Sequence, residues 1–323
     1  MSKAWNSLLV LFINVLYVSL LFNTFSEIHN IDGDIIQHYT KNISADTGSY
    51  LESGTLRTVG YGIVLRFFMM FDNWLPLILI FNCLLGAWMF YVVYDMIGRK
   101  AWILFGLGAF TAYVPMLYTD LLFATLFVTS IWLIKKNLWL HFLFLGLASV
   151  VRPSLAWFFL IEPFVLYFYG YNTVTKRWIL IYSLPIAFVV TSFNPIRNYV
   201  NYHTWTHSTV LKFNIESGEY YDGPAYFVKS FKANALSGHY DFIGAMYNKY
   251  KRDMGDKEAS TLMWWANIIA VLLNALIWLR FGYRVVRGRV NWGNVVMVAY
   301  FIVPTLFGAA GARLRLPIEW MLI

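Results

Sequence analysis

Residues 73–96 read NWLPLILIFNCLLGAWMFYVVYDM, and Asp95 is the only charged residue in this run. A membrane-spanning helix needs roughly 20 consecutive apolar residues to cross a hydrocarbon core about 30 Å thick. The run therefore predicts a transmembrane helix. The whole chain agrees, because 59% of its 323 residues are hydrophobic and only 13% are charged, against about 25% charged in soluble domains. We expect an all-α, polytopic membrane protein.

The same criterion predicts about nine transmembrane helices, which we expect to form a single membrane domain over residues 1–323. A further segment at 59–71, VGYGIVLRFFMMF, mixes aromatic and basic residues and is too short to span. It predicts an interfacial helix lying in the membrane plane. The predicted spans lie at about 6–25, 73–96, 101–118, 121–134, 138–151, 154–170, 177–193, 262–281 and 290–309.

Basic residues near the ends of the spans predict the orientation of the chain, because cytoplasmic loops carry an excess of Lys and Arg. With a cytoplasmic N-terminus, the two long hydrophilic loops at about 26–72 and 194–261 lie outside. The net charge of +8 is then explained by the cytoplasmic loops, and we expect no nucleic-acid partner. The residues assigned to the cytoplasmic side are Lys3, Arg99, Lys100, Lys135, Lys136, Lys176, Arg177, Arg284, Arg287 and Arg289.

Four arginines run against this rule, because Arg152, Arg197, Arg313 and Arg315 follow helix ends on the outer side. A lone arginine at a helix end can extend its charged group to the interface without any function. Four on one side favour a shared purpose. A guanidinium binds phosphate through paired, charge-assisted hydrogen bonds, and basic pockets at membrane level bind lipid head groups. We expect some of these arginines to converge on a lipid phosphate at the outer surface.

Acidic residues on the same side supply candidates for acid–base chemistry. Asp32 and Asp34 lie in EIHNIDGDIIQHYTKN (27–42), where one reading is a solvated Asp-Gly turn and the other is a carboxylate general base beside the arginines. Asp34 also stands where a helix N-cap would. Asp120 lies at the outer mouth of a helix, so N-capping and a role in the site both stay open.

Four motifs in this order resemble integral-membrane glycosyltransferases of the GT-C type, which include the protein O-mannosyltransferases and the lipid A aminoarabinose transferase. IDGDIIQHYTKNI (31–43) is similar to the acidic first-loop motif of that family. LRTVGYGIVLRFF (56–68) is similar to its Arg-x-Pro-Gly-Tyr-Pro segment, although both prolines are absent here. FNPIRNYVNYHTWTHST (193–209) and GARLRLPIEW (311–320) resemble its Pro-x-x-Arg-Asn-Tyr and Arg-Tyr-Arg-Leu-Pro stretches.

The resemblance implies a sugar donor linked to a polyprenyl monophosphate and a hydroxyl acceptor on a glycan, lipid or protein. Transfer would occur with inversion on the outer face of a membrane, such as the bacterial inner membrane. Asp32 would be the catalytic base, with Asp34 as the alternative. No cofactor is implied, and a divalent ion stays open because some relatives bind one. The residues implied in substrate binding are Arg57, Tyr61, Asp120, Arg152, Arg197, Asn198, Tyr199, Arg313 and Arg315.

Two other classes of function stay open. A non-catalytic transporter or flippase of a lipid-linked glycan would place charges near the midplane and show inverted repeats. Here the charges gather at one face and no repeat is visible, which favours the transferase. An accessory membrane subunit would make Asp32 dispensable.

Overall fold

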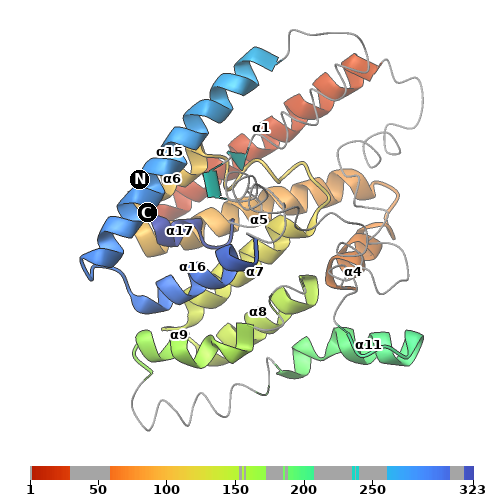
Figure 1. Cartoon of the computed structure of the whole chain (residues 1–323). Helices are drawn as coiled ribbons and strands as arrows, with labels where there is room; N and C mark the ends of the chain where they lie inside the picture. The colour runs from red at the N-terminus through yellow and green to blue at the C-terminus, as the bar shows by residue number, and fades with distance from the viewer. Residues whose placement is uncertain are drawn as a thin grey trace, which may run out of the picture.

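The computed structural model describes residues 2–29, 59–152, 155, 158–171, 185, 188–206, 235–236, 238–239, 260–305 and 316–323. Over these ranges the regular structure is helical and contains no strand, so the prediction of an all-α fold is confirmed. The helices are α1 (Lys3–His29), α4 (Val59–Phe68), α5 (Trp74–Ile97), α6 (Ala101–Gly106), α7 (Thr119–Leu133), α8 (Leu138–Val151), α9 (Glu162–Phe168), α11 (Phe193–Tyr202), α15 (Ser260–Val286), α16 (Trp292–Thr305) and α17 (Glu319–Leu322) (Figure 1).

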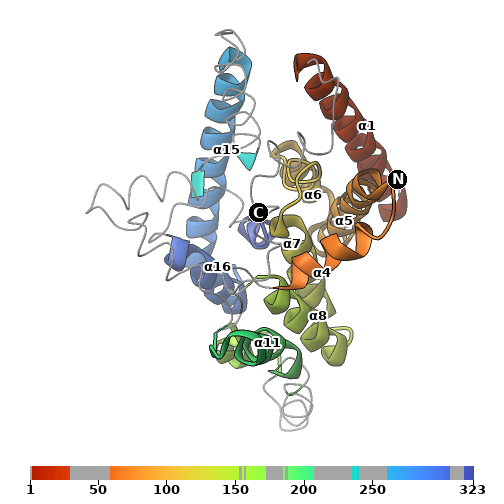
Figure 2. The same cartoon turned by 90° about the vertical axis from the view of Figure 1, so that its right-hand side faces the viewer.

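Among the described residues, three helical stretches are long and apolar enough to cross a membrane: Lys3–Leu21, Trp74–Gly106 and Ile268–Val286. Three shorter apolar helices, Thr119–Leu133, Leu138–Val151 and Trp292–Ile302, accompany them. In the view of Figure 2, α1 and α15 lie on opposite sides of α5, α6 and α7. The structure therefore agrees with a helical membrane protein, whereas it does not confirm nine spans.

The predicted span at 101–118 is wrong, because α6 ends after six residues. The amide of Ala109 donates to the carbonyl of Leu104 (3.0 Å) and that of Gly108 to the carbonyl of Phe105 (2.9 Å). Gly108 has φ 89°, the left-handed conformation that glycine adopts readily at the end of a helix. These two bonds form a Schellman motif, which ends the helix although the following residues are apolar.

The buried turns after α6 satisfy their backbone groups through asparagines on neighbouring helices. Asn82 on α5 donates to the carbonyls of Val114 and Met116, both at 3.1 Å, and Asn14 on α1 donates to the carbonyl of Phe110 at 3.1 Å. Irregular backbone is tolerated at membrane depth only where protein or water supplies such partners. Two polar side chains within apolar runs therefore accompany the break in the helix.

The predicted span at 154–170 is also not one helix. A short 3₁₀ turn at Phe158–Leu160 precedes α9 at Glu162–Phe168. Pro163 stands in the first turn of α9, where proline is tolerated because its missing amide has no intrahelical partner. Most of the predicted span at 177–193 lies outside the described residues. At 59–71 the structure has the expected helix, α4, and its position in the membrane plane stays a prediction.

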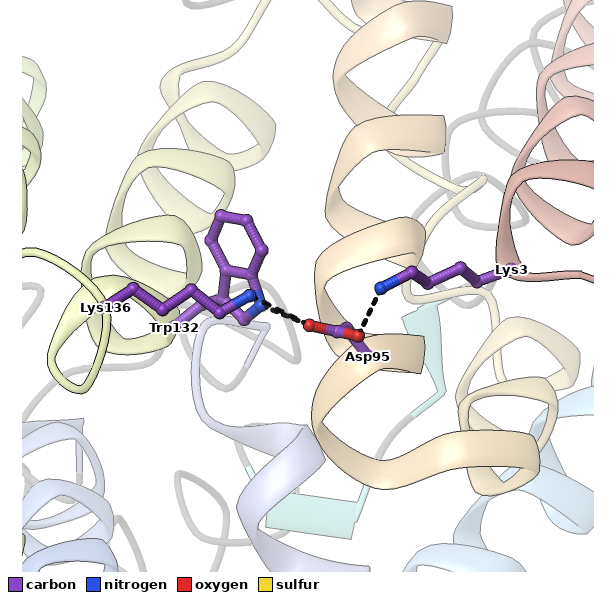
Figure 3. Close-up of polar contacts among 4 residues, drawn as sticks. All are labelled: Lys3, Asp95, Trp132 and Lys136. Atoms are coloured by element: carbon purple, nitrogen blue, oxygen red, sulfur yellow. Dashed lines mark hydrogen bonds and ion pairs between the residues drawn. The ribbon is translucent and has the colours of Figure 1, made fainter.

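A polar cluster joins α1, α5 and α7 at one end of the bundle (Figure 3). Asp95 accepts hydrogen bonds from Lys3 Nζ at 2.7 Å, Trp132 Nε1 at 2.7 Å and Lys136 Nζ at 3.1 Å. The ammonium group of Lys136 also lies 3.4 Å from the centre of the Trp132 ring. Lys3 and Lys136, which the sequence assigns to one side of the membrane, therefore lie at one end of the bundle.

The contacts also set the directions of the helices. Because the first residue of α1 meets the end of α5, these two helices are antiparallel, while the shared Asp95 cluster makes α5 and α7 parallel. α7 and α8 form an antiparallel hairpin in which the ring of His141 on α8 hydrogen-bonds the carbonyl of Ser130 on α7. The start of α7 and the end of α8 therefore lie together, at the end of the bundle opposite Asp95.

Candidate functional site

The α7–α8 hairpin brings Asp120 and Arg152 into contact. Asp120 lies in the first turn of α7, and Arg152 follows the last residue of α8. The Nη1 group of Arg152 donates to Oδ1 of Asp120, whose side chain is only 2% exposed. The guanidinium carbon also lies 5.5 Å from the centre of the Phe123 ring. Asp120 is not the N-cap, because Tyr118 holds that position and makes no side-chain cap bond.

The helix that carries Arg197 is attached to the same end of α8. Asn194, on α11, donates its side-chain amide to the carbonyl of Val150 at 3.2 Å. The hydroxyls of Thr191 and Ser149 lie 2.7 Å apart. Arg197 is three residues beyond Asn194, so two of the arginines that the sequence assigns to the outer side stand on elements that meet at the end of α8.

The local contacts of α11 orient Arg197. Its Nη1 donates to Oδ1 of Asn198 at 2.8 Å, and its guanidinium carbon lies 5.5 Å from the centre of the Tyr202 ring. Asn198 is buried and donates to the carbonyl of Thr206 at 2.8 Å. Tyr199 stacks on Trp205, with ring centres 4.6 Å apart. Asn198 and Tyr199 therefore hold the segment that follows α11 against the helix. Direct contact of either residue with a substrate stays a prediction.

Tyr61 lies on α4, which packs closely against the end of α8. A Cβ atom on the neighbouring Gly60 would lie 2.8 Å from the carbonyl oxygen of Val150, so only glycine lets the two backbones approach this closely. Tyr61 itself is fully buried. The structure thus gathers α4, α7, α8 and α11 at one place, which we call the Arg152 end of the bundle (Figure 1).

Five of the predicted site residues lie outside the described residues, and their roles stay predictions: Asp32, Asp34, Arg57, Arg313 and Arg315. Arg315 directly precedes Leu316, which starts a C-terminal segment of buried residues. Arg57 stands two residues before α4. Two of these arginines are therefore close in sequence to described elements.

The Arg152 end has the donors that an anion needs. A guanidinium carries five N–H donors in a planar fork. In Arg152, the Nη1 group makes the contact with Asp120. The carboxylate orients the fork before any ligand arrives, and Arg197 adds a second positive charge on an adjoining helix. Within the described ranges, no group of three or more His, Cys, Asp or Glu residues could hold a metal ion.

Elsewhere in the bundle lie buried ionisable residues that were not predicted from the sequence to be functional. His141 and Glu162 form a pair at 2.8 Å, and both side chains are fully buried. His239 contacts Glu319 Oε1 at 2.7 Å and the hydroxyl of Tyr113 at 2.8 Å. The signal was present, because an ionisable residue inside an apolar run is a functional candidate in a membrane protein. His141 and Glu162 both stand in such runs.

Part of the predicted outer loop at 194–261 also lies against a long apolar helix. The carbonyls of Ala235 and Leu236 accept hydrogen bonds from Trp278 Nε1 (2.9 Å) and Asn274 Nδ2 (3.0 Å) on α15. The sequence did not predict this contact, because the residues on either side of it are hydrophilic.

No family model, curated protein or solved structure matches this chain.

Proposed function

We propose that the chain is an integral-membrane glycosyltransferase that moves a sugar from a polyprenyl-monophosphate donor to a hydroxyl group on a glycan, lipid or protein. Transfer takes place on the non-cytoplasmic face with inversion. The observation that supports this most is the gathering of Asp120, Arg152 and the Arg197 helix at one end of the bundle, opposite the Lys3–Asp95–Lys136 cluster.

The arginines act on the leaving group. As the bond between the anomeric carbon and the phosphate oxygen breaks, the lipid phosphate gains negative charge. A guanidinium already oriented by Asp120 stabilises that charge without further reorganisation. Losing one well-placed donor of this kind typically costs about 3–4 kcal/mol of transition-state stabilisation. We assign this role to Arg152 and Arg197, because both stand on elements that meet at the end of α8. Arg57, Arg313 and Arg315 are further candidates.

The carboxylate of Asp32, or of Asp34 as the alternative, accepts the proton of the acceptor hydroxyl as its oxygen attacks the anomeric carbon. General-base catalysis of this kind contributes about 10²–10⁴-fold in rate. Attack from the side opposite the phosphate inverts the anomeric centre. Because the arginines balance the negative charge of the monophosphate, the mechanism has no obligatory divalent ion. The proposed reaction uses no cofactor.

Binding of undecaprenyl monophosphate to the purified protein in lipid nanodiscs tests the phosphate site. Arg152→Ala should weaken binding about 10- to 100-fold, as expected for charged hydrogen bonds worth about 1.5–3 kcal/mol. The matched control is Arg289→Ala, an exposed arginine that the sequence assigns to the opposite face, and it should bind like the wild type. Equal binding by all three proteins would remove Arg152 from the site.

One observation favours the transporter or flippase as a second candidate. The His141–Glu162 pair is buried between helices, and proton relays of transport proteins use such residues. Because this pair is buried within the bundle, the ionisable residues do not gather at one face only. A transporter would move a lipid-linked glycan across a vesicle membrane and leave the sugar–phosphate bond intact, whereas a transferase would release polyprenyl phosphate.

A further inference from the structure

The pair formed by His141 and Glu162 joins three helices. His141 lies in the first turn of α8 and Glu162 is the first residue of α9. His141 Nε2 and Glu162 Oε1 are 2.8 Å apart, and His141 Nδ1 lies 2.9 Å from the carbonyl oxygen of Ser130 on α7. Both side chains are fully buried, so every hydrogen bond that they make replaces one to water.

The two contacts determine how many protons the pair carries. A backbone carbonyl only accepts, so Nδ1 of His141 must carry a hydrogen. The contact between Nε2 and Oε1 then needs one further proton, on either atom. Without that proton, a carboxylate would face the lone pair of Nε2. If the imidazole changed tautomer to avoid this, the lone pair of Nδ1 would face the Ser130 carbonyl. Both hydrogen bonds form only when one proton bridges the two side chains.

The other carboxyl oxygen indicates which residue holds this proton. Glu162 Oε2 is buried and has no hydrogen-bond partner among the described atoms. A charged carboxylate oxygen without a donor is costly in a dry interior, whereas a neutral carbonyl oxygen costs much less. An imidazolium facing a carboxylate would also separate charge there. The neutral arrangement, with an acid O–H donating to Nε2, avoids both costs.

The described polar groups on α9 and on the adjoining turn make other contacts. Tyr169 on α9 donates its hydroxyl to Asn294 on α16, and Tyr171 donates to the carbonyl of Ile134. On the adjoining α7–α8 turn, Lys135 is exposed, and its ammonium group lies 6.0 Å from the centre of the Tyr169 ring. The next residue, Lys136, pairs with Asp95 instead.

We propose that His141 and Glu162 form a buried proton-binding site, in which the carboxylic acid of Glu162 donates to the neutral imidazole of His141. The ligand of this site is a single proton. When it leaves, Glu162 becomes a carboxylate and one of the two hydrogen bonds is lost, so α8 separates more easily from α7 or α9. This site is independent of the proposed transferase activity.

Infrared spectroscopy of the purified protein in lipid at neutral pH tests this assignment. The wild type should show a carbonyl stretching band of a protonated carboxylic acid, which shifts in D₂O and is missing in Glu162→Gln. The glutamine amide can donate to Nε2, so this variant should fold. Glu319→Gln, which alters the other buried His–Glu contact, is the matched control and should keep the Glu162 band. Identical wild-type and Glu162→Gln spectra in this region would overturn the proposal.

If the Glu162→Gln variant fails to fold, a second measurement on the wild type still tests the proposal. Nitrogen-15 NMR of labelled histidine, assigned with His141→Gln, should show Nδ1 protonated and Nε2 unprotonated at neutral pH. Two protonated nitrogens on His141 would show an ion pair and would contradict the proposal.

Discussion

At the scale of single residues, the ion pair of Arg152 with Asp120 joins the end of α8 to the start of α7. The side of the membrane on which both residues stand remains a prediction. Both side assignments come from counting Lys and Arg near helix ends. The contact depends on how α7 and α8 pair, because only an antiparallel hairpin brings the start of one helix to the end of the other. His141 and Glu162 could each have been suspected, because they are ionisable residues in apolar runs. The groups that each of them contacts could not be predicted from the sequence.

Replacing Arg152 should affect stability as well as phosphate binding. Arg152→Ala leaves the buried carboxylate of Asp120 without its cation, and removing one partner of a buried ion pair costs about 3–5 kcal/mol. Arg152→Lys should recover part of the stability and little of the phosphate binding, because an ammonium lacks the planar fork. Thermal unfolding and lipid-phosphate binding of both variants check this. A Lys variant that binds as tightly as the wild type would contradict the role of the guanidinium fork.

The choice between Asp32 and Asp34 is also made at this scale. Asp32→Asn keeps the shape and removes the base, so turnover should fall about 10²-fold or more while donor binding is largely retained. Asp34→Asn should be milder, because asparagine also caps helices well. Transfer rates and donor affinities of both purified variants decide between them. Normal turnover by Asp32→Asn with an inactive Asp34→Asn would make Asp34 the base.

At the scale of helices, apolar length alone predicted α5, α7 and α8 close to their observed bounds. It failed at 101–118, because the end of α6 is decided by Gly108 and by the asparagines that satisfy the buried turns. Hydropathy does not detect a Schellman motif. It failed again at 154–170, where Pro163 and the ionisable Glu162 start a new helix. Local backbone chemistry therefore overrode the apolar pattern in both places.

The packing of α5 gives a prediction about Gly86. A Cβ atom there would lie 2.6 Å from the carbonyl oxygen of Phe110 and 2.7 Å from Asn14 Nδ2. Gly86→Ala should therefore lower the thermal unfolding temperature, because α5 must move away from its neighbours. Gly282→Ala is the control, since nothing lies within 4 Å of its Cβ position and alanine favours a helix by about 1 kcal/mol. A Gly86→Ala protein as stable as the Gly282→Ala protein would show that the contact is not tight.

At the scale of the whole molecule, the two ends of the bundle differ in their polar groups. One end holds the Lys3–Asp95–Lys136 cluster, and the other holds Asp120, Arg152 and the attached α11. The sequence predicts that these ends face the cytoplasm and the outside, respectively. The membrane side of each end stays a prediction, as does the outer position of the two long loops.

Cysteine labelling in intact cells tests the orientation. In a Cys83→Ser background, Asn201→Cys, on the exposed surface of α11, should react with an impermeant thiol reagent. Arg289→Cys, also exposed, should react only after the membrane is broken. The reverse labelling pattern would show that the chain has the opposite orientation, with the Arg152 end in the cytoplasm.

The most direct test of the central claim is mass spectrometry of lipids and glycans from cells with and without this protein. A transferase predicts that a polyprenyl-monophosphate sugar accumulates when the protein is absent and that one glycan, lipid or protein loses a sugar residue. Expression of the wild type should reverse both changes, and expression of Asp32→Asn should reverse neither. Unchanged polyprenyl-phosphate sugars in the absence of the protein, with every acceptor fully glycosylated, would contradict the transferase.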